Sequence, residues 1–461
     1  MAMAAGAKRE KRGRLDEDGE EELVDRISRL PDGVLGDIVS FLPTKDGART
    51  QVLSSRWRPI WRSAPLNLDI RTDDVSRILS AHQGPGRRFC TEFRYFNDDP
   101  GDPSATLDRW LRSPALNNLQ EIKFHLGITM ESHALPASVH RFSSTLRAAS
   151  FGGCAFPEGN RASPLHLPLL KQLSLGDVRI SETSFNALLA ACPTLQSLLL
   201  ITSWAALAIG FRHTYYRDGH TNLQQLIIKD APYLERLLCI ENGSAQVTVV
   251  SAPKLHVLAL QSVYNLTHDV GSTTFQFGRT VFQRSCIPSS TTVVHSMKVL
   301  ALIQPDLCLD MVINLLKCFP CLEKLYIETQ NGGKKNTWCH KYKNLIGTLE
   351  IRLKKIVLTN YRGNTSHFNF AKFFVLNARM LQSMRLELFH QNPSSTWIER
   401  QNALLQIKNA SRVIQFDFVA KNSFSLMLSF LFAKQVHDLS IADPFVKLRD
   451  RTTTTIKTLF S

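Results

Sequence analysis

Long apolar runs are missing from this 461-residue sequence. No stretch reaches the roughly 18 apolar residues of a membrane-spanning helix, so we expect no membrane span. The first ten residues, MAMAAGAKRE, have no apolar core after their basic residues, so we expect no secretory signal. Nine cysteines are few for this length and odd in number, which argues against an extracellular disulfide scaffold. We therefore expect an intracellular protein, in the cytoplasm or the nucleus, with its thiols reduced.

Signatures of catalysis are missing too. The chain has no G-x-S-x-G, P-loop, G-x-G-x-x-G or H-E-x-x-H motif, and its 14 histidines are scattered. Cys318 and Cys321 form a C-x-x-C with Cys339 and His340 downstream, a set of soft ligands that can bind zinc. However, the first pair lies in a turn that leads into an apolar segment, and the second pair is adjacent in sequence, unlike a two-plus-two zinc site. We predict no metal site, no cofactor and no enzymatic activity.

Charge is unevenly distributed. The net charge is +15, from 55 Lys and Arg against 40 Asp and Glu. Residues 1–22 are highly charged and poor in large apolar residues, so we predict a disordered tail. Its basic part, residues 8–14, is either a nuclear localisation signal or simply solvated. Residues 350–461 carry 16 Lys and Arg and 7 Asp and Glu, and in residues 332–344 lysines surround Trp338 and Tyr342. This pattern fits either nucleic-acid binding or a solvated loop.

Residues 23–70 predict three short helices. Leu30-Pro31-Asp32 opens the first, in which apolar residues up to Leu42 recur at helical spacing until Pro43 ends it. We expect the Thr44 hydroxyl to cap the second helix, and Ser54 the third, which carries Trp57 and Trp61 on one face and is kinked or shortened by Pro59. Helices this short cannot bury all their apolar groups among themselves. The surplus must pack on the rest of the chain or on a partner.

This module resembles an F-box. The resemblance rests on Leu30-Pro31, Leu35, Ile38, Leu42-Pro43, Val52-Leu53-Ser54, Arg56-Trp57 and Trp61, in the family's order and spacing. It implies docking to the Skp-type adaptor of a cullin-based ubiquitin ligase. By the same resemblance, most of the contact would come from Leu30, Pro31, Val34, Leu35, Ile38, Leu42, Val52 and Leu53, while Trp57 and Trp61 would anchor the box to the following domain or complete its core.

A six-residue pattern, L-x-x-L-x-L with conservative replacements, recurs through residues 106–350 and a little beyond. Its spacing, mostly 24–32 residues, is typical of leucine-rich repeats, each of which contributes a strand and a return segment. Stacked repeats form a solenoid whose parallel strands line the concave face. The hexads start at Leu119, Leu146, Leu170, Leu195, Leu223, Leu255, Met297, Leu322, Leu353 and Leu381.

Some return segments have a helical pattern. Residues 181–195 begin with a capping Ser, residues 309–322 are similar, and residues 272–282 form an extra strand in the one long gap. The concave positions are predicted to be Ser174, Leu199, Ile227, Ala259, Ala301, Tyr326, Val357 and Arg385. The apolar ones, with Leu199, Ile227 and Tyr326 as candidate target contacts, form a ligand surface unless loops or the C-terminal tail cover them.

Residues 351–461 predict a strand, a turn at residues 361–364, a buried helix and a second strand, followed by a less regular tail. The segments LKKIVLTNYRG, FAKFFVLNARMLQSM, ASRVIQFDF and VHDLSIADPF resemble the FBD region of plant F-box proteins, the last two in a grass-lineage form. We expect this region to continue the solenoid and to cap its open edge.

Together these features predict an α/β protein, with an N-terminal three-helix F-box, a leucine-rich-repeat solenoid and an α/β C-terminal cap. The resemblance implies a substrate-recognition subunit of an SCF-type ubiquitin ligase, which binds a Skp-type adaptor and a target protein. The alternative is a repeat scaffold or nucleic-acid-binding protein that uses the basic C-terminal half.

Overall fold

The computed structural model describes residues 27, 29–42, 44–69, 72–92, 102–127, 133–157, 165–201, 225–241, 246–262, 275–277, 280–282, 293–304, 307–329, 350–389, 394–405 and 414–420. Several sequence predictions lie outside these residues: the charged tail 1–22, the basic loop 332–344, Cys339 and His340, and the segment VHDLSIADPF. Within the described residues, no helix is both long and apolar enough to cross a bilayer.

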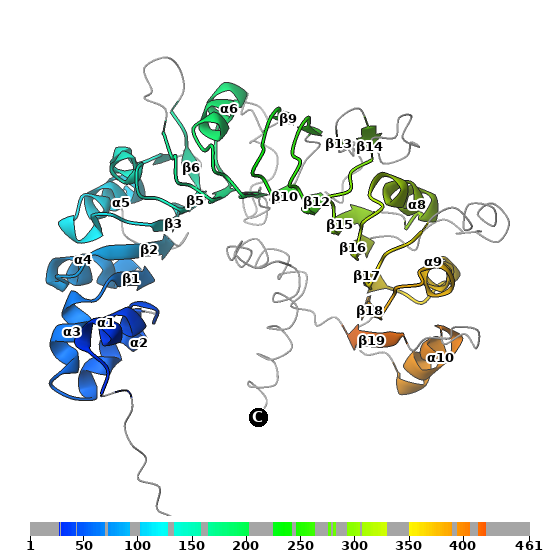
Figure 1. The fold of residues 1–461 in the computed structure, drawn as a ribbon, viewed down its shortest axis with the longest axis horizontal. Helices are drawn as coiled ribbons and strands as arrows, with labels where there is room; N and C mark the ends of the chain where they lie inside the picture. Colours follow the sequence, from blue (N-terminus) through cyan, green and yellow to red (C-terminus); the bar gives the residue numbers. More distant parts are fainter. Residues whose placement is uncertain are drawn as a thin grey trace, which may run out of the picture.

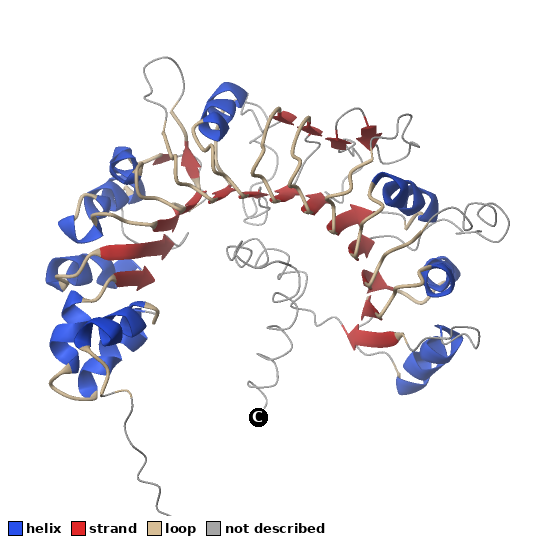
Figure 2. Ribbon diagram, in the orientation of Figure 1, coloured by secondary structure: helices blue, strands red, loops and turns tan. Residues whose placement is uncertain are grey.

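The described chain forms an arc (Figure 1). A 13-stranded sheet lines its inner face, and most helices lie on its outer face (Figure 2). All its described strand pairs are parallel, as predicted for a repeat solenoid. The strands are, in order, β1 (Leu66–Asp69), β2 (Gly86–Glu92), β3 (Glu121–His125), β5 (Ala148–Gly152), β7 (Gln172–Gly176), β8 (Ser197–Ile201), β10 (Arg236–Glu241), β12 (Val257–Ser262), β15 (Val299–Gln304), β16 (Lys324–Thr329), β17 (Lys355–Tyr361), β18 (Ser383–Leu388) and β19 (Gln415–Ala420).

Return segments supply the other elements. Helices α1 (Asp32–Ser40), α2 (Thr44–Arg49) and α3 (Trp57–Ser63) precede the sheet, and the later helices are α4 (Thr72–Ala81), α5 (Pro103–Leu111), α6 (Glu182–Ala190), α8 (Leu309–Cys318), α9 (Thr365–Asn377) and α10 (Ser395–Leu405). The 3₁₀ turns are η1 (Thr50–Val52), η2 (Pro114–Leu116) and η3 (Ala137–Phe142). Smaller sheets contain β9 (Gln225–Ile228), β11 (Gln246–Val249), β13 (Phe275–Phe277) and β14 (Thr280–Phe282), and β4 (His133–Ala134) with β6 (Cys154–Ala155).

One buried residue in each strand forms the centre of the core. The fourth position of the hexad is in register from strand to strand, so that Leu173 pairs with Leu198, and Leu198 with Leu237. All three are at most 1% exposed and belong to the main apolar core. Such a side chain is buried only when the neighbouring repeat stacks on it, so the hexad pattern leads directly to a continuous solenoid.

Hydroxyl side chains at the turn before a strand tie successive repeats together. Thr145 Oγ1 donates to the carbonyl of Leu119 at 2.7 Å, and Ser296 Oγ donates to the carbonyl of Leu255, also at 2.7 Å. Thr194 Oγ1 lies 3.1 Å from the carbonyl of Leu170. These groups satisfy backbone acceptors that would otherwise be left at the edge of each repeat.

Most of the predicted strands are confirmed, but one predicted strand lies in a different sheet and another segment takes its place. Nine of the ten hexads lie at strands of the 13-stranded sheet, but the hexad at Leu223 forms β9, which pairs with β11 in the four-stranded sheet. The sheet strand of that repeat is β10, whose similar pattern begins at Leu234. The predicted strand in residues 272–282 is instead two short antiparallel strands, β13 and β14.

The predicted helices α6 and α8 are confirmed. The Ser181 side chain accepts from the Ser184 amide at 3.2 Å and caps α6, as expected. The strand, turn, helix and strand predicted in the C-terminal region are β17, residues 361–364, α9 and β18. Asn364 caps α9 by accepting from the His367 amide at 2.9 Å.

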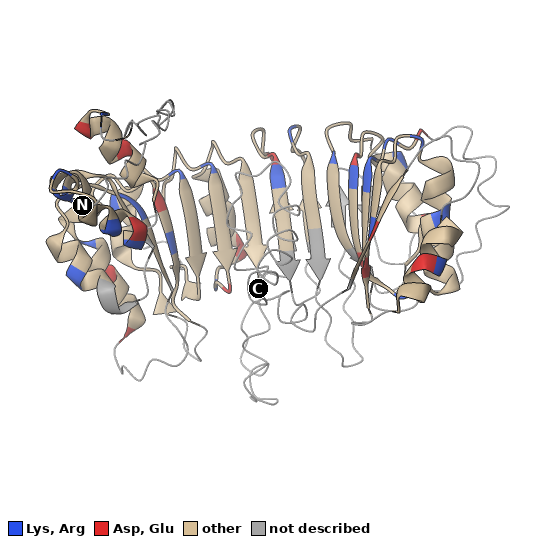
Figure 3. Cartoon of the chain, turned by 90° about the horizontal axis from the view of Figure 1, so that it is seen from below, with Lys and Arg blue, Asp and Glu red and all other residues tan. Residues whose placement is uncertain are grey.

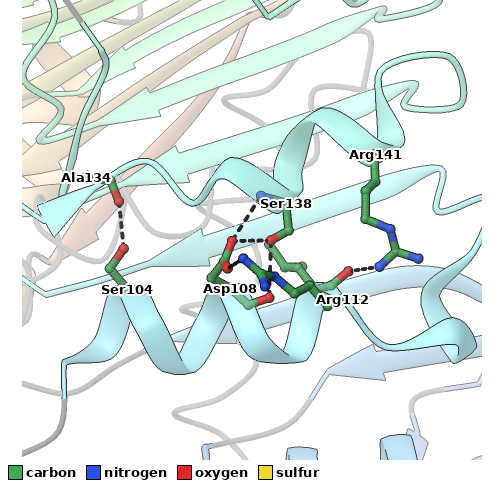
Figure 4. Close-up of polar contacts among 7 residues, drawn as sticks. Ser104, Asp108, Arg112, Ala134, Ser138 and Arg141 are labelled. Carbon is green, nitrogen blue, oxygen red and sulfur yellow. Dashed lines mark hydrogen bonds and ion pairs between the residues drawn. The ribbon is translucent and has the colours of Figure 1, made fainter. Parts of the chain in front are cut away.

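A polar clamp links α5 to the next repeat (Figure 4). Asp108 Oδ1 accepts from the Ser138 amide at 3.0 Å and from Ser138 Oγ at 2.7 Å, so a side chain of α5 caps η3. Asp108 Oδ2 lies 2.6 Å from Arg112 Nη2. Arg141 of η3 donates back to the Leu111 carbonyl at the end of α5. Partial burial raises the pKa of Asp108, but the hydrogen bonds from Ser138 and the charge of Arg112 outweigh it and hold this pKa below its usual value.

The clamp predicts a pH-dependent stability. Because the pKa of Asp108 is lower in the folded state than in the unfolded one, its contribution is present above about pH 4 and is lost as the pH falls through the folded value. We expect Asp108→Asn to lower the free energy of unfolding by about 1 kcal/mol at neutral pH, measured by urea titration. The difference from wild type should shrink in acid, and a constant difference would contradict the assignment. Asp230→Asn, at an exposed turn, serves as the control.

The turn before α9 predicts a glycine requirement. Gly363 has φ +67°, and a Cβ at this position would collide with the Trp397 ring of α10. We expect Gly363→Ala to lower the free energy of unfolding by about 2–4 kcal/mol through backbone strain and overpacking. Gly176→Ala is the matched control, because a Cβ there meets nothing within 4 Å. Equal urea midpoints for the two variants would show that the turn tolerates a side chain.

Candidate functional site

The first three helices form a small core of their own. Leu35 and Val39 of α1 pack with Trp57 and Ile60 of α3, in a cluster separate from the main core. Leu35 is 0% exposed, so it supports the module from inside. This differs from the sequence prediction, which placed Leu35 among the contact residues. The helical spacing of residues 34–42 does not by itself show which side of α1 faces α3.

Other apolar side chains of the module face solvent. Val52 is 86% exposed and Leu53 is 67% exposed, both at η1. On α1, Val34 and Ile38 are exposed one turn apart, and Phe41 follows at 71% exposed. Of the remaining predicted contact residues, Pro31 is exposed, and Leu30 and Leu42 are partly exposed. We call the solvent-facing set Val34, Ile38, Phe41, Val52 and Leu53 the apolar box surface.

Arg56 fixes the start of this surface. Its guanidinium donates to the Leu30 carbonyl at 2.5 Å and to Asp32 Oδ1 at 2.7 Å, which ties the beginning of α1 to the beginning of α3. Ser54 does not cap α3 as predicted, because α3 begins at Trp57 after Arg56. Pro59 is the third residue of α3, where its missing N–H leaves no helical bond unmade.

The module is joined closely to the solenoid. Asn67 Nδ2 donates to the Ser40 carbonyl, and the Asn67 carbonyl accepts from Thr44 Oγ1. The Thr44 hydroxyl, which the sequence predicted to cap the second helix, therefore bonds to the first strand of the sheet. The Arg87 guanidinium lies 4.9 Å above the centre of the Phe41 ring. Because β1 is itself the first strand of the 13-stranded sheet, the two parts share one framework.

The two tryptophans differ in position. Trp57 is buried in the core of the three helices, whereas Trp61 touches both that core and the main core and meets the His82 ring edge-on at 5.5 Å. Burial lowers the pKa of His82, and His82 Nε2 lies 2.9 Å from the Ala64 carbonyl. The resemblance left two roles open for these tryptophans, anchoring the box to the following domain or completing its core. In the structure Trp61 has the first role and Trp57 completes the helical core.

The concave face has a polar, an apolar and a charged part. Figure 3 marks the charged residues along its strands. Its central row, one residue per strand in register, runs from Cys90 and Lys123 through Leu199, Ala259 and Tyr326 to Arg385 and Asp417. The predicted concave positions lie in this row, except Ile227. Ile227 belongs to β9 in the four-stranded sheet, and Leu238 of β10 takes its place.

The apolar middle of that row is not an open surface. Leu199 is 0% and Tyr326 3% exposed, and they cluster with Leu238, Val299 and Val357, which are equally buried. The prediction that Leu199, Ile227 and Tyr326 contact a target therefore does not fit this structure: two are covered, and Ile227 lies on another sheet.

In the described part of the chain, the cysteines do not belong to a cluster that could hold a metal ion. Cys318 is buried at the end of α8, where burial raises the pKa of its thiol. Cys321 Sγ lies 4.0 Å from His295 Nδ1. Burial also raises the pKa of Cys154 and of Cys192 to about 12, which keeps both protonated at neutral pH. Among the described residues, no three His, Cys, Asp or Glu side chains converge.

Comparison with known families matches three segments of the chain. The F-box domain model matches residues 27–69, which contain the three helices and β1. The model for the LRR repeats of FBD-associated F-box protein At5g56370 matches residues 107–327, and the FBD model matches residues 343–386. The chain has the three domains of the F-box/FBD/LRR-repeat proteins.

Curated relatives carry the same domain names. F-box/LRR-repeat protein At3g03360 of Arabidopsis thaliana is 32% identical over 190 residues, 39% of this chain and 39% of the relative. F-box/LRR-repeat protein 13 is 28% identical over 55% of this chain and 61% of the relative, and F-box/FBD/LRR-repeat protein At1g78750 is 27% identical over 53% and 58%, both from the same plant. The chain thus spans about half the length of the curated relatives it matches. The grass-lineage form of the tail stays a prediction.

Truncating a side chain on the buried face of α1 should lower stability much more than truncating one on its exposed face. We expect Leu35→Ala to lower the free energy of unfolding of the F-box by about 2–5 kcal/mol, because it leaves a cavity among α1 and α3. Val34→Ala, the adjacent but exposed residue, should change it by less than about 0.5 kcal/mol. Amide hydrogen exchange across residues 31–63 measures both. Equal protection in the two variants would show that the core is not where the structure has it.

Proposed function

We propose that the chain is a substrate-recognition subunit of an SCF-type ubiquitin ligase, in which the F-box binds a Skp-type adaptor and the solenoid holds a target protein. The observation that carries the proposal is the apolar box surface. Five large apolar side chains on a module of three short helices are exposed, although a folded domain normally buries them. The F-box family match supports the adaptor as the partner that covers them.

The exposed residues are aliphatic and aromatic, the residue types that the buried centre of a protein interface contains. Val52 and Leu53 lie at a 3₁₀ turn and Phe41 adds an aromatic ring, so association would remove several large apolar side chains from water. Each fully buried aliphatic side chain contributes about 1.5–3 kcal/mol. Of the predicted contact residues, Val34, Ile38, Val52 and Leu53 remain the best candidates, with Phe41 added and Leu35 reassigned to the core.

The solenoid would contribute geometry rather than chemistry. The shared β1 strand and the bonds between Asn67, Ser40 and Thr44 hold the F-box in a fixed place at one end of the arc. A target bound by the repeats would then be held at a defined distance from the adaptor. Bringing two reactants together in this way raises their effective concentration and leaves the bond-making steps to other subunits.

The adaptor interface can be tested with charges on the apolar box surface. We expect Val52→Asp/Leu53→Asp to reduce adaptor retention in a pull-down at least tenfold, because burying the new carboxylates is costly. Both positions are highly exposed, so the fold should persist. The matched control is Leu404→Asp, an exposed apolar residue of α10, which should bind the adaptor like wild type.

Salt separates this proposal from charge-driven binding. Adaptor retention that depends on apolar contact should be nearly unchanged between low and high salt, whereas nucleic-acid binding weakens steeply. Failure of the wild-type chain to retain a Skp-type adaptor under either condition would overturn the proposed function.

A further inference from the structure

Lysines gather at the starts of β15, β16 and β17 in the concave sheet. Lys298 directly precedes β15, Lys324 begins β16, Lys354 directly precedes β17, and Lys355 begins β17. We call these four the strand-start lysines. Lys298 is exposed and the other three are partly exposed, in contrast to the covered apolar row beside them. Figure 3 shows blue segments at one end of these strands.

Register brings two of these charges together. Lys324 pairs with Lys355, so their backbones lie about 4.8 Å apart and both side chains leave the same face of the sheet. That face is the concave one, because the next residues, Leu325 and Ile356, point into the main core. Like charges directly side by side in a sheet are unfavourable unless a counter-charge lies near.

One carboxylate is close, and it is already engaged. Glu323 Oε2 lies 2.9 Å from Lys354 Nζ. The hydrogen bond from Lys354 holds the pKa of Glu323 below its usual value, burial opposes this, and the charges of Lys354, Lys298 and Lys324 add to it. Within the described residues, no carboxylate lies within 4.0 Å of Lys298 or of Lys355. The four lysines and this one glutamate have a formal net charge of +3.

The other end of the same strands has the opposite sign. Glu328 of β16 and Glu387 of β18 lie four residues beyond the first residues of their strands. Glu387 accepts from Thr359 Oγ1 at 2.9 Å and lies 3.4 Å from Arg385 Nε. A ligand that crosses β16–β18 therefore meets lysines at the strand starts and two carboxylates further along, one of them paired with Arg385, which favours one orientation.

We propose that the strand-start lysines form the target-binding subsite of the solenoid and accept an acidic segment of the target protein. This rests on the proposed function, which makes the ligand a protein. The charge pattern favours an acidic peptide over a nucleic acid. Tight nucleic-acid binding typically uses about 6–10 phosphate contacts, whereas this group has a net charge of +3 and carboxylates at the opposite strand ends.

The direct test uses the full-length chain and a fluorescent peptide in which Glu alternates with Ser. We expect the wild type to bind it at low salt, with affinity that falls as salt rises. Lys324→Glu/Lys355→Glu should weaken binding about tenfold or more, because two attractive charges become repulsive. The matched control is Arg147→Glu/Lys171→Glu, two exposed residues that directly precede β5 and β7. It makes the same change in net charge and should alter the affinity less than about twofold.

Other outcomes would overturn the proposal. Loss of binding in both double variants would show a general charge effect, and lack of binding by wild type would show that there is no such site. The same measurement uses an oligouridylate with as many phosphates as the peptide has carboxylates. If the wild type binds it more tightly than the peptide, and Lys324→Glu/Lys355→Glu abolishes that binding, the group is a nucleic-acid site instead.

Adaptor retention keeps the two proposals separate. Lys324→Glu/Lys355→Glu should retain the Skp-type adaptor like wild type, since the F-box lies at the opposite end of the arc (Figure 1). Loss of adaptor binding in this variant would indicate misfolding. In that case the peptide measurement is repeated with Lys324→Gln/Lys355→Gln. A chain that binds the adaptor but not the acidic peptide would overturn this inference alone.

Discussion

The stacking of one buried residue per strand is the constraint on which the whole structure depends. Leu173, Leu198 and Leu237 are buried and lie in register in neighbouring strands. No repeat is stable alone, and the sheet must continue from its first strand to its last. Because β1 immediately follows the F-box helices, that continuity also reaches the box. The stacking which stabilises the solenoid therefore also fixes where the F-box points.

Large apolar side chains are exposed on the F-box but buried on the concave face of the sheet. On the F-box, Val52 and Phe41 stay in water, because three short helices have too little interior to take them. On the concave face, Leu199 and Tyr326 are covered. The strand-start lysines, in contrast, are exposed or partly exposed. The two proposed interfaces thus differ in kind, with an apolar one for the adaptor and an electrostatic one for the target.

Local sequence was least reliable where two segments carried the same pattern. The hexad at Leu223 and the segment from Leu234 are only eleven residues apart and equally apolar, yet the first forms β9 and the second forms β10. Only one strand can fill the place between β8 and β12, and the fit with those neighbours decides which. The predicted cap at Ser54 was wrong for a similar reason. The start of α3 depends on a contact with a distant segment, in which Arg56 bonds to Leu30 and Asp32.

The sequence alone determined the element types, the repeat architecture and the resemblance to an F-box, because spacing along the chain carries those signals directly. It could not decide which apolar residues face outward. Leu35 and Val34 are neighbours with similar side chains, and only the packing of α1 on α3 buries the first and exposes the second. Nor could it show that Lys324 and Lys355, 31 residues apart, lie side by side. Contacts between repeats are set by register, which exists only once the strands have stacked.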